Sequence, residues 1–453
     1  MTGAERRVLV VAVLASFVAF LDGTVVNVAL PAITDDLGGG VRLQQWTVDA
    51  YLLTLGALIL LAGSLSDVYG RVPVLRVGLI GFGATSVAIA LAPSGEFLIV
   101  ARALQGVAGA LLVPSSLALI TATFRGPAQA KAIGAWTAWT STTFLGGPVL
   151  GGLIIDLVDW RWVFGINVLP ILVTLWLLRR VESPPRSADA RVDWLGAILG
   201  VLGLAGPVFA LIEQSTLGWG HPAVYLPAAL GVGCLIAFVL RQRRASHPML
   251  PLDLFRRRTF AAGNLATAFF YAALSLSGLV IAVYLQQVAG FTATEASLAV
   301  LPTAVANVAL ASWFGSLSAR FGARLFMTVG PLLAASGHLL LLATGEEVAY
   351  ASQVLPGILV FALGLSMTVA PLTSAILGSI PARLSGIASA TNNAVSRVAG
   401  LVSVAFLGVI LAGPLTAESF HRSLVVIAAL FVVAGVVSFA GVRRTEETST
   451  DDR

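Results

Sequence analysis

Residues 8–31 read VLVVAVLASFVAFLDGTVVNVALP, and this stretch decides the class of the protein. Apart from Asp22 it is almost entirely apolar, and it exceeds the roughly 20 residues that a helix needs to cross a bilayer. A carboxylate inside such a span costs roughly 2.5–3.5 kcal/mol on insertion scales, so an acid there is a functional candidate by default. The sequence therefore predicts a membrane-spanning first helix with a functional acid at Asp22.

The rest of the chain has the same apolar character. Of its 453 residues, 57% are hydrophobic and 11% are charged, whereas a soluble domain carries about 25% charged residues. The mean hydropathy is +0.93. This composition predicts an all-α polytopic membrane protein, since a β-barrel would show shorter alternating segments. We expect fourteen spans, at residues 8–30, 46–65, 75–93, 97–124, 131–155, 161–179, 193–213, 223–240, 260–285, 296–317, 325–343, 350–376, 386–411 and 423–441.

The basic residues indicate the orientation of these spans. Of the 27 Lys and Arg residues, 22 fall on one set of loops and tails, three fall on the other, and Arg102 and Arg397 lie inside spans. Basic residues accumulate on the cytoplasmic side of membrane proteins. We therefore expect both termini to be cytoplasmic. The net charge of +5 then reflects topology, and we expect no nucleic-acid partner.

Several function classes lack their usual residues. The one lysine, Lys131, follows Ala130, so the Gly-Lys-Ser/Thr of a Walker A loop is missing. Cys234 is the single cysteine, and the four histidines are scattered without metal-ligand spacing. We therefore expect no cofactor, no metal and no enzymatic activity. Any uphill transport must draw on an ion gradient or on a partner ATPase.

An internal repeat relates the two halves of the chain. Residues 63–71 (GSLSDVYGR) recur as residues 315–323 (GSLSARFGA), with five of nine positions identical, after the second and the tenth expected spans. The alternative is a chance match in a Gly- and Ser-rich chain. Two parallel repeats describe a transporter with a midplane site. We expect an amino-terminal six-helix bundle (1–185), a two-helix insert (186–245), a carboxy-terminal six-helix bundle (246–445) and a tail (446–453).

Four ordered motifs identify a family. They are residues 21–31 (LDGTVVNVALP), 63–71, 102–106 (RALQG) and 146–152 (GGPVLGG). Together they resemble the major facilitator superfamily, and within it the fourteen-span branch of drug:proton antiporters. The resemblance covers nearly the whole chain. It implies two six-helix bundles plus the two-helix insert, and alternating access between the bundles.

The resemblance assigns proton coupling to Asp22 and Arg102, and we add Asp49. With a rise of 1.5 Å per residue, the three lie roughly 12, 8 and 5 Å from the outer ends of their spans. They can meet in the outer half of the first bundle, where alternate pairing would switch protonation. Two plainer interpretations stay open. Asp22 can be an ion-pair strut to Arg102, and Arg102 can extend its charge to the membrane surface.

A second group of residues is expected to control conformation. Asp67, Gly70 and Arg71 match the superfamily's cytoplasmic loop, in which Asp67 would latch the halves through a basic residue, although Val68 and Val72 replace its usual basic positions. The alternative is a structural turn only. The motif in span 5 resembles the one that marks exporters, and there we single out Gly147, Pro148, Gly151 and Gly152. A packing kink without directional meaning is the alternative.

A third group is expected to bind substrate: Asn27, Glu213, Asn392, Asn393 and Arg397. Asn27 belongs to the span-1 motif, and the last three lie deep in span 13. Interhelical hydrogen bonding by the asparagines is equally compatible with the sequence. Glu213 ends span 7, and its position there favours a rim residue over a substrate ligand. The arginine-rich linker between spans 8 and 9 either marks topology or binds anionic lipid.

We therefore predict a proton-coupled multidrug efflux antiporter for lipophilic or cationic compounds. Its partners would be a small-molecule substrate, protons and membrane lipids, and we expect a monomer in the inner membrane of a bacterial cell. The alternative is an exporter of an endogenous lipid or secondary metabolite with the same fold. An integral membrane enzyme or sensor is a third class, but no nucleophile–base cluster, metal cluster or soluble output domain is recognisable.

Overall fold

The computed structural model describes residues 2–182, 192–245, 248–345, 347–381, 384–413 and 415–442. The boundary expected at 185–186 and the tail 446–453 lie outside these ranges. Within them the chain is helical and shows no strand. The elements are α1 Gly3–Leu37, α2 Gly40–Tyr69, α3 Arg71–Ala90, α4 Gly95–Thr123, α5 Gly126–Leu157, α6 Trp162–Gly165, α7 Val168–Leu178, α8 Trp194–Leu217, α9 Pro222–Arg244, η1 Leu252–Arg256, α10 Arg258–Gln287, α11 Ala293–Phe321, α12 Ala323–Leu340, η2 Leu341–Ala343, η3 Tyr350–Val354, α13 Leu355–Gly378, α14 Ser385–Ala405, α15 Leu407–Leu411 and α16 Ala417–Gly441.

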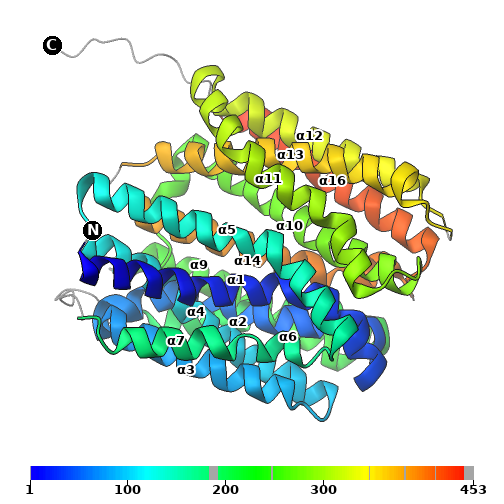
Figure 1. Cartoon of the computed structure of the whole chain (residues 1–453), viewed down its shortest axis with the longest axis horizontal. Coiled ribbons are helices and arrows are strands. Elements are labelled where there is room, and N and C mark those ends of the chain that lie inside the picture. Colours follow the sequence, from blue (N-terminus) through cyan, green and yellow to red (C-terminus); the bar gives the residue numbers. More distant parts are fainter. Residues whose placement is uncertain are drawn as a thin grey trace.

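The long helices run side by side and form two bundles (Figure 1). Helices α1–α7 make the first bundle, and α10–α16 make the second. Between them in sequence, α8 and α9 pack on each other and form the insert, and α8 also contacts α2 and α14. The bundles meet along two seams, α5 against α11 and α2 against α14. The expected architecture of two bundles plus a two-helix insert is therefore confirmed.

The number of spans is less firmly established than the architecture. Among the described residues, 12 helices are long and apolar enough to cross a membrane, and α8 and α9 are two of them. The remaining two expected spans, 131–155 and 161–179, correspond to shorter apolar helices, Gly146–Leu157 and Trp162–Leu178. These two helices are not among the 12. The total of fourteen spans therefore stays a prediction.

Three spans expected to be continuous contain breaks. Residues 161–179 divide into α6 and α7, with Ile166 and Asn167 between them. The span at 350–376 begins as a π-helical turn, and the span at 386–411 is interrupted at Phe406 between α14 and α15. Counts of apolar residues do not detect such breaks, because the side chains on both sides remain apolar. The first break matters most, since it places Asn167 in the first bundle's polar centre.

The internal repeat has a matching turn in each half. Gly70 joins α2 to α3 with a φ of 97°, and Gly322 joins α11 to α12 with a φ of 85°. A residue with a side chain rarely adopts this conformation, so glycine is required at both turns. The two copies of the repeat therefore form equivalent sharp corners, which start α3 and α12 in corresponding directions.

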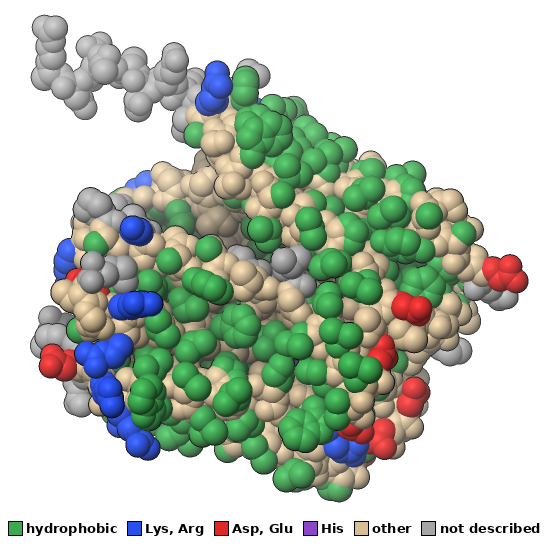
Figure 2. All heavy atoms as spheres, viewed as in Figure 1, with side chains coloured by type: hydrophobic (Ala, Val, Ile, Leu, Met, Phe, Trp, Pro, Cys, Tyr) green, Lys and Arg blue, Asp and Glu red, His purple; other side chains and the backbone are tan. Residues whose placement is uncertain are grey.

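The two ends of the molecule differ in the charge of their side chains and in the hydrogen bonds that join the two bundles. Basic side chains gather at the end where α1 begins, which we call the basic end, and acidic side chains gather at the opposite, closed end (Figure 2). Among the described residues, the hydrogen bonds between the bundles lie toward the closed end, from Gln45 to Val404 and Ala405, from Gln286 to Val28, and from α11 to Asp156. No hydrogen bond or ion pair joins the bundles at the basic end within the described ranges. Among the described residues, the hydrogen bonds that join the two bundles therefore lie at the closed end alone.

The insert is fastened at the basic end by Asp193, which precedes α8. Its carboxylate accepts a hydrogen bond from Gly196 N–H at 2.9 Å, pairs with Arg241 at 2.7 Å and accepts from Gln242 at 3.0 Å. Burial raises the pKa of Asp193, but these three partners lower it more, and the pKa lies below its ordinary value of 3.8. The carboxylate thus joins the start of α8 to the end of α9.

Replacing Asp193 with alanine should therefore loosen the insert by about 1 kcal/mol, the usual value of a helix cap. Because the folded-state pKa of Asp193 is depressed, its contribution is present above pH 3.8 and is lost as the pH falls through the lower folded-state value. The measurement is the thermal midpoint of variant and wild type at neutral pH and below pH 3.8. A difference that is the same at both pH values would contradict this role.

Candidate functional site

The centre of the first bundle holds a buried ion pair between α1 and α4. Arg102 Nη1 lies 2.6 Å from Asp22 Oδ2, and each side chain is only 1% exposed. Arg102 Nε also donates to the carbonyl oxygen of Thr47 in α2 at 2.9 Å. A charge pair removed from water this completely requires good geometry and further hydrogen bonds to be tolerated.

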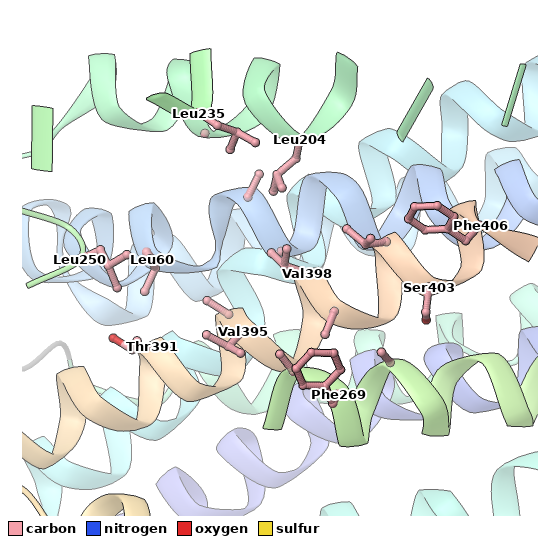
Figure 3. Close-up of a pocket in the computed structure, with 18 of the residues that line it drawn as sticks. Leu60, Leu204, Leu235, Leu250, Phe269, Thr391, Val395, Val398, Ser403 and Phe406 are labelled. Carbon is pink, nitrogen blue, oxygen red and sulfur yellow. The ribbon is translucent and has the colours of Figure 1, made fainter. Parts of the chain in front are cut away.

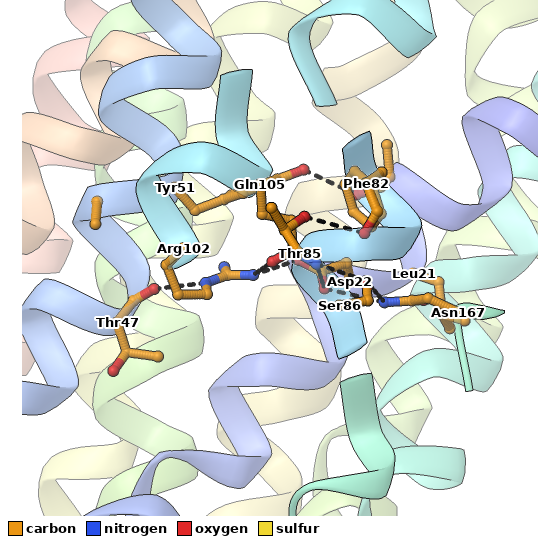
Figure 4. Close-up of polar contacts among 12 residues, drawn as sticks. Leu21, Asp22, Thr47, Tyr51, Phe82, Thr85, Ser86, Arg102, Gln105 and Asn167 are labelled. Atoms are coloured by element: carbon orange, nitrogen blue, oxygen red, sulfur yellow. Dashed lines mark hydrogen bonds and ion pairs between the residues drawn. The ribbon is translucent and has the colours of Figure 1, made fainter. Parts of the chain in front are cut away.

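Those further bonds come from α3, α4 and the break between α6 and α7 (Figure 4). Gln105 donates to Asp22 Oδ1 at 3.2 Å and to Ser86 Oγ at 2.9 Å, and it accepts from Arg102 at 2.6 Å. Asn167 donates to Asp22 Oδ1 at 3.2 Å. Five side chains thus form one network in which both oxygens of Asp22 have partners. We call it the Asp22 network.

Close helix packing positions the arginine of this network. A Cβ atom at Gly106 would overlap the Thr54 hydroxyl and the Tyr51 carbonyl, so only glycine lets α4 approach α2 this closely. This approach brings Arg102 against α2, where its guanidinium carbon lies 4.4 Å from the centre of the Tyr51 ring. The arginine therefore has little freedom to move while Asp22 remains charged.

Asp49 does not join the Asp22 network. Its side chain is fully buried, and neither carboxylate oxygen has a hydrogen-bond partner among the described residues. One and two turns away on the same face of α2, Gln45 and Gly56 contact α14. The prediction that all three charges meet is therefore wrong for Asp49 in this conformation, because the helix turns it toward the second bundle.

The residues expected to bind substrate are dispersed. Arg397 of α14 crosses to the first bundle, where its guanidinium carbon lies 5.6 Å from the centre of the Phe20 ring. Asn392 donates to Thr267 in α10 at 2.8 Å, which is an interhelical bond. Asn393 is exposed and donates only within its own helix. Asn27 is half-buried where α1 passes α10, with its amide 3.7 Å from a Cβ position at Gly278.

Glu213 lies at the closed end and fastens the insert to the first bundle. It pairs with Arg42 at 2.8 Å and accepts a hydrogen bond from Trp46 Nε1 at 2.8 Å, and both partners belong to α2. Its side chain is 7% exposed. This arrangement matches the rim residue that the sequence favours, and it leaves the carboxylate occupied in this conformation.

The residues expected to control conformation fall into two places. Asp67 lies 3.7 Å from Arg71 across the turn at Gly70, within the first bundle, and forms no ion pair with a described residue of the second bundle. The latch between the halves is therefore not formed in this conformation. The glycines of α5 lie against other helices: Gly147 against Thr24, Gly151 against Val25 and Gly152 against α11. Pro148 lies between them, inside α5.

Gly152 and Asp156 close the seam between α5 and α11. A Cβ atom at Gly152 would lie 2.7 Å from the carbonyl oxygen of Ala293, so glycine is needed for this approach. One turn further on, the Asp156 carboxylate accepts the N–H groups of Ala293 at 3.2 Å and Thr294 at 2.8 Å. It thus satisfies two of the free N–H groups that begin α11 and complements the positive end of the helix dipole.

Replacing Asp156 with alanine should open the closed end in a measurable fraction of molecules. Hydrogen bonds to a charged group contribute about 1.5–3 kcal/mol each, and two are lost. Spin labels at Leu91 and Glu418, one at the closed end of each bundle, report the distance between the bundles. We expect a second, longer distance in the variant.

The control for this prediction is Asp36→Ala. Asp36 is also acidic and lies at the closed end, but its partners Arg161 and Trp160 belong to its own bundle. The same distance distribution in Asp156→Ala and wild type would contradict the role of this contact, and so would an equal change in the control.

The sequence did not identify three residues of these sites. Ser86 and Asn167 complete the Asp22 network, and Asp156 closes the seam. Ser86 and Asn167 are uncharged and carry little signal within apolar spans. The available signal for Asp156 was its spacing, since it follows Gly152 by four residues and lies on the same face of the helix.

The fold and the buried network together define a class of protein. Two helical bundles, an internal parallel repeat and a buried charge network at the centre of one bundle are features of a membrane transporter with alternating access. The Major Facilitator Superfamily family model matches residues 12–404. The chain therefore belongs to the major facilitator superfamily, and it is a multi-pass membrane protein.

Similar proteins of known name are resistance proteins and exporters. The chain is 34% identical to the puromycin resistance protein pur8 of Streptomyces alboniger, over 89% of this chain and 81% of that one. It is 33% identical to the multidrug resistance protein Stp of Mycobacterium tuberculosis, over 92% and 78%. Among solved structures, the inward-open xylose transporter XylE from E. coli matches with a TM-score of 0.67 at 16% identity, over 98% of both chains, which supports the fold alone.

Proposed function

We propose that this protein is a proton-coupled multidrug efflux antiporter that exports lipophilic or cationic compounds by alternating access. We place it as a monomer in the bacterial inner membrane with both termini in the cytoplasm. The names of its relatives support drug efflux as the activity. The division into a first bundle (1–185), an insert (186–245) and a second bundle (246–445) belongs to the same proposal.

The observation that carries the proton coupling is the Asp22–Arg102 pair. At 2.6 Å and 1% exposure, its attraction depends wholly on the charge of Asp22. Protonation of Asp22 removes that charge and leaves Arg102 free to turn toward other partners. A proton that enters the Asp22 network therefore changes the packing among α1, α2 and α4, and this change can bias the two bundles toward one conformation.

Asp49 is the second proton-carrying group in this proposal. An ionised carboxylate without a hydrogen-bond partner is too costly to bury, so Asp49 is expected to hold its proton in the present conformation. It lies on the face of α2 that meets α14, which moves when the bundles separate at the closed end. Opening would hydrate Asp49 and allow it to release the proton.

If the basic residues orient the chain with its basic end in the cytoplasm, this conformation is inward-facing. In this proposal the basic end is cytoplasmic, because basic residues accumulate on that side of membrane proteins, and the contacts of Asp156 and Gln286 then close the outer side. In this proposal Gly147, Gly151 and Gly152 let α5 move between α1 and α11. Asp67, Gly70 and Arg71 would form the latch between the two bundles in the opposite, outward-facing state.

A second candidate function is export of a secondary metabolite made by the cell itself. Two relatives favour it, the probable actinorhodin transporter of Streptomyces coelicolor at 35% identity and a tetracenomycin C resistance and export protein of Streptomyces glaucescens at 33% identity. Arg397, whose guanidinium reaches Phe20 of the first bundle, and the exposed Asn393 are the residues we expect to contact either kind of cargo.

A substrate panel tests the proposal. Purified protein in liposomes is supplied with fluorescent lipophilic cations and neutral lipophiles, with an imposed pH gradient and the membrane potential clamped. We expect cargo to move against its concentration gradient while protons move the opposite way, and a proton ionophore to abolish this movement. If uphill transport persisted in the presence of the ionophore for every compound, proton coupling would be contradicted. If the protein transported none of the compounds, drug efflux would be contradicted.

A further inference from the structure

A cavity of about 660 Å³ lies between the insert and the two bundles. Its walls come from α2, α8, α9, α10, α14 and α16 together with the segment that precedes α10 (Figure 3). None of the residues assigned to proton coupling or cargo binding lines it. We call it the insert cavity and define it by Leu60, Leu204, Leu235, Leu250, Phe269 and Val398.

The lining of the insert cavity is suited to hydrocarbon. Apart from Thr391 and Ser403, every lining residue is apolar or glycine. The Ser403 hydroxyl is already bonded to the Gly400 carbonyl at 2.9 Å. The Thr391 hydroxyl has no hydrogen-bond partner among the described residues, so the lining offers a ligand this single polar side-chain group. A polar ligand would therefore exchange its water for one partner at most, whereas an alkyl chain would gain from the burial of its surface.

The cavity extends along α14 for at least the depth of one leaflet of a bilayer. Helix α14 lines it from Thr391 to Ser403, which spans about 18 Å at the helical rise of 1.5 Å per residue, and Phe406 and Ile410 continue the lining beyond α14. Half of a hydrocarbon core of about 30 Å is of similar length. An acyl chain that entered from the basic end would therefore lie along α14 for roughly the depth of its own leaflet.

Positive charge stands at the end of the cavity where such a lipid would have its headgroup. Leu250, which lines the cavity, donates its N–H to Gln242 at 3.1 Å, next to Arg243 and Arg244. These two arginines are exposed and have no acidic partner among the described residues. Arg256 follows the lining residue Phe255 and is 85% exposed, and its one acidic partner among the described residues is the likewise exposed Asp253 at 3.9 Å. Basic clusters at this level of a membrane protein attract anionic lipid headgroups.

We propose that the insert cavity binds an acyl chain of an anionic phospholipid, with the headgroup held by Arg243, Arg244 and Arg256. The lipid completes the packing between the insert and the second bundle, and it takes no part in proton coupling. This assignment gives α8 and α9 a role in lipid binding that is separate from the Asp22 network. It stands even if the cargo of the protein proves to be different.

Photocrosslinking of the full-length protein in liposomes tests this proposal. The probes are phosphatidylglycerol and phosphatidylcholine that carry a photoactivatable group in the acyl chain. We expect phosphatidylglycerol to label lining residues of α8, α9 and α14 in the wild type, and phosphatidylcholine to label them far less. The Arg243→Gln/Arg244→Gln variant should lose roughly thirtyfold of that preference, since each of the two basic residues near the surface contributes about 1 kcal/mol and about 1.4 kcal/mol corresponds to a factor of ten.

A second variant fills the cavity. A Cβ atom at Gly200 meets only Phe238, at 3.8 Å or more, so Gly200→Phe places a ring in the cavity without a backbone clash. It should reduce the labelling to background. The matched controls are Gly233→Phe, which has open space around it on α9, and Arg6→Gln/Arg7→Gln, which removes the same charge from α1.

Three outcomes would overturn the proposal. The first is equal labelling of the cavity by both lipids in the wild type, and the second is undiminished labelling in Gly200→Phe. The third is loss of labelling when transported cargo is added, together with loss of efflux in Gly200→Phe, which would place the cavity on the cargo route. The wild-type crosslink map decides the first outcome even if a variant fails to fold.

Discussion

Replacing Arg102 with leucine should destabilise the protein by about 3–5 kcal/mol, because it leaves the Asp22 carboxylate buried without its countercharge. The remaining donors, Gln105 and Asn167, are neutral and lie at 3.2 Å. The measurement is the thermal unfolding midpoint in detergent at one fixed scan rate. At about 2–4 °C per kcal/mol, the midpoint should fall by roughly 10 °C.

Two further variants separate loss of the ion pair from loss of an arginine. Arg397→Leu removes the other arginine within a span, which forms no ion pair among the described residues, so its midpoint should fall much less. Asp22→Asn/Arg102→Leu removes both charges and should regain most of the lost stability. An equal midpoint in the two single arginine variants would contradict this account of the network.

Replacing Asp22 with asparagine should abolish uphill transport while exchange of cargo for cargo continues. The amide nearly preserves the shape of the carboxylate within the Asp22 network but cannot take up or release the coupling proton. Because 1.4 kcal/mol corresponds to a tenfold ratio, a gradient of two pH units supports roughly a hundredfold accumulation per proton exchanged. We expect the wild type to approach that ratio and Asp22→Asn to stop near equality.

The control for this prediction is Asp35→Asn on the same helix. Asp35 is exposed at the closed end of α1 and has no ion pair among the described residues, so its variant should accumulate cargo as the wild type does. If Asp22→Asn accumulated cargo normally, the coupling acid would have to be elsewhere. If Asp22→Asn lost exchange as well, the role of Asp22 would be structural.

Much of the architecture could be predicted because apolar length and charge are strong signals. The spans, the insert and the turns of the repeat follow from windows of about 20 uncharged residues and from paired glycines. The break between α6 and α7 could not be predicted, because Ile166 and Asn167 fit an uninterrupted helix equally well. That break depends on packing of the first bundle around Asp22, which a single span does not encode.

The charged residues of the candidate site could be predicted from the sequence, but their hydrogen-bond partners could not. Asp22 and Arg102 stand out, since charged residues inside a span are rare. Depth estimates then placed Asp49 beside them, but depth along an axis does not fix the face of a helix. Asp49 and the carbonyl of Thr47 lie on different faces of α2, and only the second faces Arg102.

The most direct measurement of the central claim is the movement of protons by the protein itself. Proteoliposomes with an internal pH-sensitive dye receive a pulse of transported cargo in weakly buffered solution, with the membrane potential clamped. The account predicts proton movement opposite to cargo in the wild type and in Asp35→Asn, and none in Asp22→Asn, although cargo still exchanges in that variant. Proton movement of wild-type size in Asp22→Asn would contradict it.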